Sequence, residues 1–317
     1  MTSAVRRPTP VLYIGGLGRS GSTLLDRMLG ELPGVTSAGE LVHLWQRGVL
    51  EDQLCACGER FSECPFWTKV GHEAFGGWHA PEVGEARRLQ RLVDRNRYVP
   101  TVASPLRASE FDERVGRYAE LIGRLYGAIS SVAGGAIVVD SSKHASTAFV
   151  LRAAPSISLR MIHLVRDARG TAYSWTKAVR RPEVADRDVL MHTHAPWRTA
   201  ARFDSWNLLL HVLSLLGVPT TFVRYEDLVA DPRGEMKRIV TVAGLRPDGI
   251  LDFIEDDVVT LGTPHSVSGN PMRFSTGRIP VRADDEWRRG LSPRDRATVT
   301  AISWPLLAAY GYLRSGR

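Results

Sequence analysis

The sequence has no apolar run that reaches the about 18 residues needed for a membrane-spanning helix. Its first ten residues include two arginines and two prolines, but not the hydrophobic core of a secretory signal. Lysine tracts and low-complexity segments are also missing, and the basic residues are scattered rather than interleaved with aromatic ones. These absences predict a cytoplasmic protein with no membrane span and no nucleic-acid partner.

Cysteine is scarce, with 3 residues among 317, and all three lie close together as Cys55, Cys57 and Cys64. Such a group is compatible with zinc if a histidine such as His43 or His72 completes the ligand set. A disulfide between Cys64 and either of the other two, or three reduced thiols in a small turn, fits the segment as well. Because no second cysteine pair or histidine pair is present, we assign no metal and expect a structural turn with reduced thiols.

Size and charge set broad limits on the protein. With 317 residues, of which 44% are hydrophobic, the chain is long enough for one elaborated domain over residues 1–317. Lysine and arginine exceed aspartate and glutamate by 41 to 34, a net charge of +7. This excess suits an anionic ligand.

A glycine-rich segment follows the first apolar run of strand length. Val11–Ile14 leads into a turn with four glycines, and a helix is expected to begin near Ser22. The spacing from Gly16 to Thr23 matches the phosphate loop of nucleotide triphosphatases, except that Ser22 stands where those enzymes need a lysine. Arg19 is the cation that remains, and its planar guanidinium can hold two oxygens of a phosphate or sulfate. The segment therefore predicts an anion site that does not split a nucleotide triphosphate.

A second anion site is predicted after another strand. Ser158–Val165 is apolar, and Arg166 would stand at its carboxyl end, where open α/β sheets bind ligands. Ser174 would lie about two turns into the helix that follows, facing the same crevice. An ordinary ion pair between Arg166 and Asp167 is the alternative for this segment.

Four segments together resemble one protein family. Arg19-Ser-Gly-Ser-Thr-Leu-Leu25 resembles the 5′-phosphosulfate loop of sulfotransferases that use 3′-phosphoadenosine 5′-phosphosulfate (PAPS), and Leu164–Ser174 resembles their 3′-phosphate site. Val223–Val229 is similar to the family's strand-end tyrosine segment, and His265–Phe274 to the late loop that covers the nucleotide. The resemblance implies that PAPS is the donor, with no metal, and that these residues bind it: Gly18, Arg19, Ser20, Gly21, Ser22, Thr23, Leu24, Arg166, Ser174, Tyr225, Ser268, Gly269, Asn270 and Arg273.

One position departs from the family's pattern. Tyrosyl-protein sulfotransferases carry an extra nucleotide-binding arginine four residues after the matching serine, where this chain has Ala178. Lys177, Arg180 and Arg181 are the neighbouring cations that are candidates to replace this arginine in binding the nucleotide.

The catalytic residues implied by the resemblance are Glu40, Lys143 and Arg19. Glu40 follows Arg19 by 21 residues, the interval between the loop arginine and the catalytic glutamate of tyrosyl-protein sulfotransferases. Burial is expected to raise the pKa of Glu40 toward neutrality, as a general base requires. Lys143 would offset charge on the oxygen that leaves. The alternatives are a Glu40 that favours a helix N-terminus and a Lys143 that is merely solvated.

The expected fold is α/β, a P-loop-like three-layer arrangement with a mostly parallel sheet covered by helices on both faces. We expect strands at 11–16, 35–38, 136–140, 159–165 and 220–225, and helices at 22–32, 40–48, 84–98, 110–132, 145–153, 168–180, 197–216, 232–243 and 293–310. Trp287, Trp304 and Tyr310 are expected to pack the last helix against the core.

These features predict a sulfotransferase that moves the sulfuryl group of PAPS to a hydroxyl or amine. Residues 41–132, a helical and Cys-containing insertion, and residues 181–205 are expected to shape the site for a small-molecule, lipid or carbohydrate acceptor, with Trp45, Trp78, Trp175 and Trp197 as its aromatic candidates. A P-loop nucleotide kinase and a non-catalytic anion-binding or nucleic-acid-binding module are the alternatives.

Overall fold

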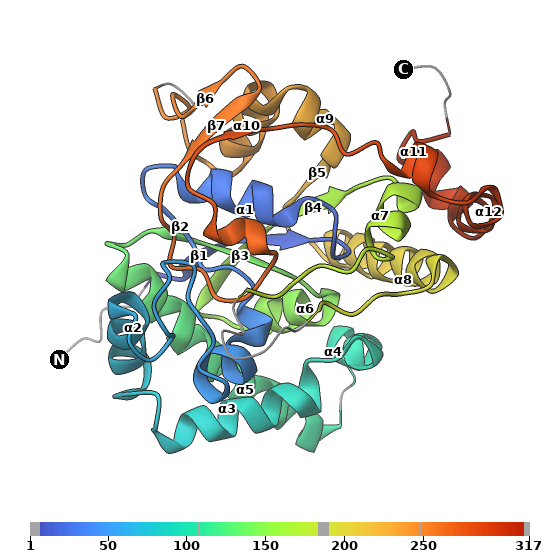
Figure 1. The fold of residues 1–317 in the computed structure, drawn as a ribbon. Coiled ribbons are helices and arrows are strands. Elements are labelled where there is room, and N and C mark those ends of the chain that lie inside the picture. Colours follow the sequence, from blue (N-terminus) through green and yellow to red (C-terminus); the bar gives the residue numbers. More distant parts are fainter. Residues whose placement is uncertain (1–6, 105, 107, 183–189, 247–248, 314–317) are drawn as a thin grey trace.

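A parallel sheet of five strands forms the centre of the computed structural model, which describes residues 7–104, 106, 108–182, 190–246 and 249–313. The strand order is β2-β3-β1-β4-β5, and every neighbouring pair is parallel (Figure 1). Parallel order places all five carboxyl ends at one edge, where ligands bind in such sheets. The strands are β1 (Thr9–Gly15), β2 (Val35–Ser37), β3 (Ile137–Lys143), β4 (Ile157–Val165) and β5 (Thr220–Arg224).

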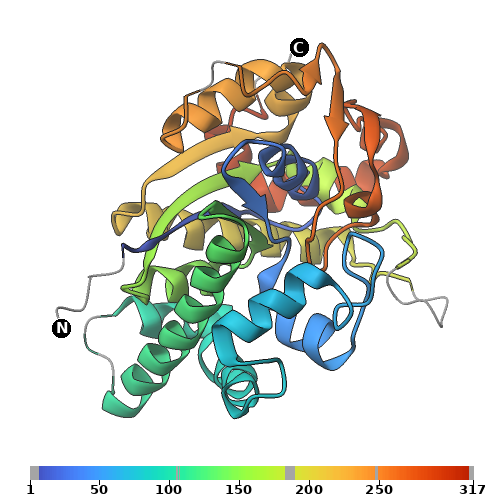
Figure 2. The same cartoon turned by 90° about the vertical axis from the view of Figure 1, so that its left-hand side faces the viewer.

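Helices cover both faces of this sheet because successive strand residues point to opposite sides (Figures 1 and 2). Val11 and Tyr13 of β1 belong to the apolar cluster on one face, and Leu12 and Ile14 to the cluster on the other. The first face carries α5 (Ser109–Val132), α6 (Ala145–Ala153) and α8 (Pro196–Leu215). The second carries α1 (Ser22–Gly30), α9 (Tyr225–Ala230) and α10 (Pro232–Val242). The predicted three-layer α/β fold is confirmed.

Residues 41–132 form a mainly helical segment between β2 and β3. A 3₁₀ turn, η1 (Leu41–His43), and a π-helical turn, η2 (Leu44–Leu50), replace the helix predicted over 40–48. The segment continues with α2 (Pro65–Phe75), α3 (Pro81–Val93), the 3₁₀ turn η3 (Asn96–Tyr98), α4 (Val99–Ala103) and α5. Buried aromatic side chains, among them Trp45 and Trp67, hold its first half together.

A second, antiparallel sheet lies near the C-terminus and was not predicted. It consists of β6 (Ile254–Glu255), β7 (Val258–Leu261) and β8 (Gly277–Pro280), in the order β6-β7-β8. The late loop, residues 262–276, connects β7 to β8 and contains the 3₁₀ turn η4 (Pro271–Phe274).

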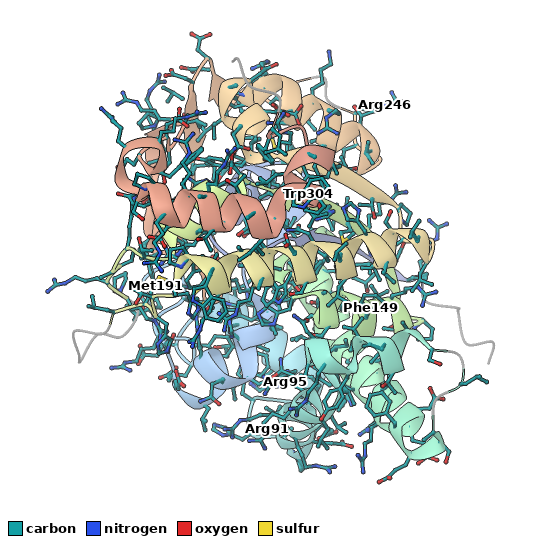
Figure 3. The ribbon with its side chains drawn as sticks, turned by 90° about the vertical axis from the view of Figure 1, so that its right-hand side faces the viewer. Arg91, Arg95, Phe149, Met191, Arg246 and Trp304 are labelled. Carbon is teal, nitrogen blue, oxygen red and sulfur yellow. The ribbon has the colours of Figure 1, made fainter. Side chains whose placement is uncertain are left out.

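Three further helices complete the described chain: α7 (Ala168–Ser174), which ends earlier than predicted, α11 (Trp287–Gly290) and α12 (Pro293–Ala309). Trp287 and Tyr310 are buried, but the prediction for Trp304 was wrong, since 59% of it is exposed on α12 (Figure 3). Ser303 and Leu307, four residues apart, define the buried face of that helix, and Trp304 lies beside this face. Among the described helices, none has the length and apolar character to cross a membrane.

Candidate active site

The glycine-rich loop turns sharply at the carboxyl end of β1, and its geometry requires glycine at two positions. Gly16 has φ 152°, and a Cβ atom there would lie 2.3 Å from the Leu164 carbonyl oxygen. Gly21 has φ 88°, and its Cβ would lie 2.4 Å from the ring of Tyr225. Both contacts are too short for any side chain. The loop therefore packs directly on β4 and on the tyrosine that follows β5.

This loop opens into a cavity of about 510 Å³ at the carboxyl edge of the sheet. Ser22, Thr23 and Leu24 line it from the first turn of α1, where backbone N–H groups and the helix dipole favour an anion. Arg19 enters the same cavity with φ 72°, an unusual backbone conformation for arginine. In the part of the chain that the structure describes, the Nε atom of Arg19 and the Oγ atom of Ser20 are buried without a hydrogen-bond partner. Because Arg19 lines the cavity, its unpartnered Nε–H group suits an oxygen of a bound anion.

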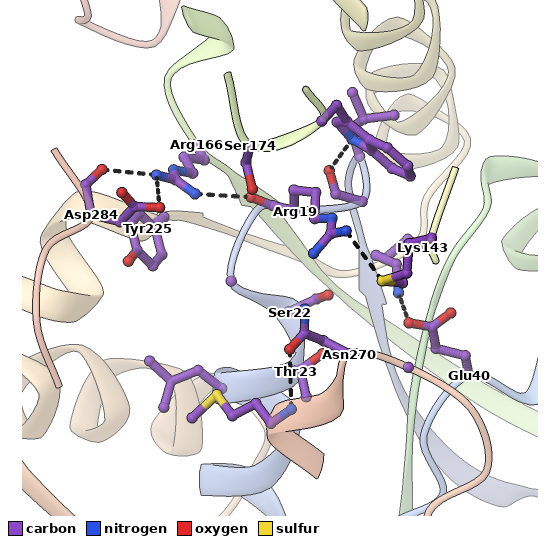
Figure 4. Close-up of a pocket in the computed structure, with 18 of the residues that line it drawn as sticks. Arg19, Ser22, Thr23, Glu40, Lys143, Arg166, Ser174, Tyr225, Asn270 and Asp284 are labelled. Carbon is purple, nitrogen blue, oxygen red and sulfur yellow. Dashed lines mark hydrogen bonds and ion pairs between the residues drawn. The ribbon is translucent and has the colours of Figure 1, made fainter. Parts of the chain in front are cut away.

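Arg166 lines one end of this cavity (Figure 4). Its guanidinium lies over the Tyr225 ring, 4.8 Å from the centroid, and donates to the Arg19 carbonyl over 3.3 Å. It also forms an ion pair of 3.0 Å with Asp284, whose pKa is lowered because this attraction outweighs the effect of burial. Ser174, at the end of α7, lines the cavity as well. Arg19 and Arg166, from separate motifs, thus open onto one cavity.

A buried ion pair stands at the other end (Figure 4). The Nζ atom of Lys143, the last residue of β3, donates to Glu40 Oε1 over 2.5 Å and to the Ser141 carbonyl over 2.7 Å. Burial alone would raise the pKa of Glu40, but the positive charge of Lys143 and its hydrogen bond outweigh burial and lower that pKa to about 2. The expected rise toward neutrality is therefore wrong for the ligand-free chain, because Lys143 lies so close.

Two histidines, His43 and His144, also line the cavity near this pair, with their ring centroids 6.0 Å apart. Burial lowers the pKa of His43 to about 3 and that of His144 to about 4, so both rings are neutral. His43 Nε2 is 3.5 Å from Glu40 Oε2, and the His144 ring meets Trp206 edge-on at 4.9 Å. His43 follows Glu40 by three residues and His144 follows Lys143 directly, and this proximity in sequence is the signal for their place in the cavity.

Most of the predicted donor-binding residues line the cavity, but Ser20, Ser268 and Arg273 do not. Ser268 is buried and accepts a hydrogen bond from Arg47. The guanidinium of Arg273 is buried and donates to the carbonyls of Ser266 and Leu54. Arg273 therefore joins the late loop to the cysteine segment, which corrects its expected place at a phosphate.

Other cations line the cavity without belonging to any motif: Arg47, Arg202 and Arg282. None of the described candidates near Ala178 lines it, since Lys177 pairs with Glu286 and Arg181 donates to Gln53. Sequence alone offered no means of finding Arg282, which comes from the segment between β8 and α11.

α8 and the segment before it contribute Met191, His194, Thr199, Arg202 and Trp206 to the lining of the cavity. The 41–132 segment adds His43 and Arg47 to this lining. Trp45 and Trp78 pack against each other away from the cavity, and Trp197 is half exposed. Of the four tryptophans predicted for an acceptor, Trp175 lines the cavity, donating to the Gly18 carbonyl over 2.9 Å.

The carboxylates that line the cavity in the described chain are Glu40 and Asp284, and each is paired with a cation. Asp140, in the middle of β3, is buried and accepts hydrogen bonds from Tyr126 and Ser142 instead. Ser22 occupies the place of the triphosphatase lysine and carries no charge. This arrangement lacks the lysine and the free carboxylate that magnesium-dependent phosphoryl transfer requires.

Comparisons with known proteins identify the family and the fold. The model of a sulfotransferase family matches residues 10–248. The sulfotransferase domain of the olefin synthase of Synechococcus PCC 7002 has the same fold, with a TM-score of 0.52 and 20% identity over 96% of this chain and 97% of that one. Sulfotransferase STF9 of Mycobacterium avium gives a TM-score of 0.46 and 14% identity over 97% of this chain and 77% of that one. No curated protein matches by sequence. Since the family model covers more than half of its length, the chain belongs to the sulfotransferase family.

Proposed function

We propose that the protein transfers the sulfuryl group of PAPS to the hydroxyl of a small-molecule acceptor. One observation carries this proposal: the phosphate-type loop, Arg166 and the Lys143–Glu40 pair all line one cavity. A nucleotide with two separate anionic groups needs two cationic positions, and a transfer reaction needs an acid-base pair near one of them. The carboxyl edge of the sheet supplies both.

The donor would lie along the carboxyl edge of the sheet. Its 5′-phosphosulfate fits the N-terminus of α1 and Arg19, whose buried Nε atom lacks a partner among the described residues. Its 3′-phosphate fits Arg166 and Ser174, and would replace Asp284 on the guanidinium. Gly269 and Asn270 of the late loop would contact it from the opposite wall.

The transfer step follows from this placement. The acceptor oxygen attacks the sulfur, the bond between that sulfur and the 5′-phosphate oxygen breaks, and adenosine 3′,5′-bisphosphate leaves. Glu40 takes the acceptor proton, while Lys143 and Arg19 balance the charge on the departing phosphate oxygen.

Glu40 becomes a stronger base when the donor binds. In the ligand-free chain, Lys143 holds the pKa of Glu40 at about 2, too low for efficient proton transfer. A phosphosulfate anion that draws the ammonium toward itself weakens this attraction, and the remaining burial raises the pKa of the carboxyl. Donor binding would thereby prepare the base for the second substrate.

The acceptor would enter between Glu40 and α8. Trp206 and the neutral rings of His43 and His144 give this part of the wall an aromatic character, and Arg202 adds one cation. A hydroxyl on a partly apolar molecule, whether a phenol, a lipid or a sugar derivative, matches such a wall. We also propose a cytoplasmic location, where thiols such as these three stay reduced.

Binding of adenosine 3′,5′-bisphosphate tests the donor assignment directly. A ligand present at about 100 times its dissociation constant stabilises a protein by about 2.7 kcal/mol, which a thermal shift detects. Adenosine 5′-phosphate and ATP with magnesium serve as controls. Stabilisation by ATP with magnesium, and none by the bisphosphate, would replace the proposal with a kinase. Transfer of radiolabelled sulfur from PAPS to a panel of phenols, lipids and carbohydrates would then identify the acceptor class.

A further inference from the structure

The three cysteines and one distant histidine converge outside the active-site cavity. Cys55, Cys57 and Cys64 lie in the turn before α2, and His265 lies in the late loop some 200 residues later. Their four ligand atoms, three Sγ and one imidazole nitrogen, all lie within 4.8 Å of one another. Cys55 and Cys64 are buried, while Cys57 and His265 are partly exposed.

The spacing of these atoms matches a tetrahedral metal site. The Cys64 sulfur is 3.7 Å from each of the other two sulfurs and 3.3 Å from His265 Nδ1. Ligands at zinc bond lengths in a tetrahedron place two sulfurs about 3.8 Å apart and a sulfur and a nitrogen about 3.6 Å apart. A disulfide instead needs a sulfur–sulfur distance of about 2.05 Å and would leave the third thiol unpaired.

We propose that Cys55, Cys57, Cys64 and His265 bind one Zn²⁺ ion. Three thiolates and an imidazole form a soft ligand set, which favours zinc over magnesium or calcium, and four protein ligands close the site to substrate. The ion would therefore be structural. His43 and His72, the histidines nearest in sequence, are excluded as the fourth ligand, because His43 contacts Glu40 and His72 is exposed on α2.

The surroundings are built to hold such a centre in place. The His265 ring stacks on Phe66 at 5.2 Å, and the Ala56 N–H donates to the Ser266 carbonyl over 3.1 Å. Arg273 donates to the carbonyls of Leu54 and Ser266, which directly precede and follow ligands, and its charge offsets the net negative charge of a zinc ion with three thiolates.

Zinc at this position would fasten the late loop to both the cysteine turn and the active site. Val267, two residues after His265, accepts a hydrogen bond of 2.8 Å from the Glu40 N–H, and its own N–H donates to Ala38 over 3.0 Å. Gly269 and Asn270, further along the loop, line the cavity. The ion would thus set the position of the loop that covers the proposed donor site and of the backbone that carries Glu40.

Metal analysis of the full chain, purified without chelators from zinc-supplemented cells, tests the proposal. We expect about one zinc per chain, released when a mercurial reagent titrates the three thiols. Cobalt(II) should replace zinc with thiolate-to-metal charge-transfer absorption and the visible bands of a tetrahedral ion. Zinc-free protein with three reactive thiols, or a disulfide found by mass spectrometry, would overturn the proposal, as would stoichiometric iron or copper.

Two variants separate the site from adventitious binding. His265→Ala should weaken zinc binding by at least about 100-fold, more than loss of an outer-shell partner costs. His72→Ala, an exposed histidine on the neighbouring α2, should keep full occupancy. If His265→Ala does not fold, hydrogen exchange of the wild type gives the answer. Zinc removal should then speed exchange in the late loop but not in α12, and equal exchange in both would refute the fastening role.

Discussion

Replacing Glu40 by glutamine should change stability, donor affinity and turnover in different directions. Glu40 and Lys143 are nearly buried, with 13% and 9% of their side chains exposed, and are 2.5 Å apart. Removal of one partner of a buried ion pair costs about 3–5 kcal/mol, because the other charge remains without compensation. Urea unfolding of the ligand-free Glu40→Gln variant should show this loss.

The same variant should bind adenosine 3′,5′-bisphosphate at least as tightly as the wild type does, because the nucleotide no longer competes with Glu40 for Lys143. Turnover should nevertheless fall by about 100-fold to 10,000-fold, the usual cost of losing a general base. Calorimetry measures the affinity, and transfer of radiolabelled sulfur measures the rate. Glu73→Gln, an exposed change on α2, is the matched control. Weaker nucleotide binding would refute the competition, and an unchanged rate would refute the role of Glu40 as base.

Three further predictions concern the loop, the second arginine and pH. Arg166→Ala should weaken bisphosphate binding by about 1.5–3 kcal/mol in calorimetry, whereas Arg278→Ala, an exposed change on β8, should not. Gly21→Ala should lower the melting temperature and abolish bisphosphate binding, because the new Cβ atom would clash with the Tyr225 ring. Gly34→Ala is the control, since Gly34 has φ 73° but open space around it, and it should lose only the about 1–3 kcal/mol of stability that the strained backbone costs. Burial raises the pKa of Asp26 from 3.8 to about 7, so its carboxyl favours folding below pH 3.8 and this contribution is lost as pH rises through 7. Urea unfolding at acidic and alkaline pH should therefore show Asp26→Asn gaining stability over the wild type as pH rises, by a total on the order of 4 kcal/mol; a constant difference would contradict this.

Much of the central sheet could be predicted from sequence because its strands are buried on both faces and read as continuous apolar runs. The strand predicted over 159–165 is β4 at Ile157–Val165. The antiparallel sheet was missed because its strands have only two to four residues and carry charged side chains such as Glu255 and Arg278. α2 was missed because it directly follows Cys64 in a segment that resembled a turn.

The site divides in the same way. Residues of the glycine-rich loop are close together in sequence as well as in space, so Arg19 and Ser22 could be identified from their spacing alone. Asp284 and Arg282 reach the cavity from a segment without a motif, and their place depends on the course of the chain between distant elements. Arg273 shows the limit of charge as a guide, because its side chain donates to carbonyl groups in the interior and does not line the cavity.

The ion pair between Arg166 and Asp284 bears on which nucleotides the protein would accept. The Asp284 carboxylate, 3.0 Å from the Arg166 guanidinium, already neutralises its charge. A bound nucleotide therefore gains binding free energy from Arg166 only if it interacts with the guanidinium more strongly than this single negative charge does. A 3′-phosphate dianion on the ribose would bind the guanidinium more strongly than the carboxylate does, whereas an unmodified ribose hydroxyl would not. Adenosine 5′-phosphosulfate, which lacks the 3′-phosphate, would therefore not displace Asp284 from Arg166. In this way Asp284 would help the protein to select nucleotides that carry a 3′-phosphate.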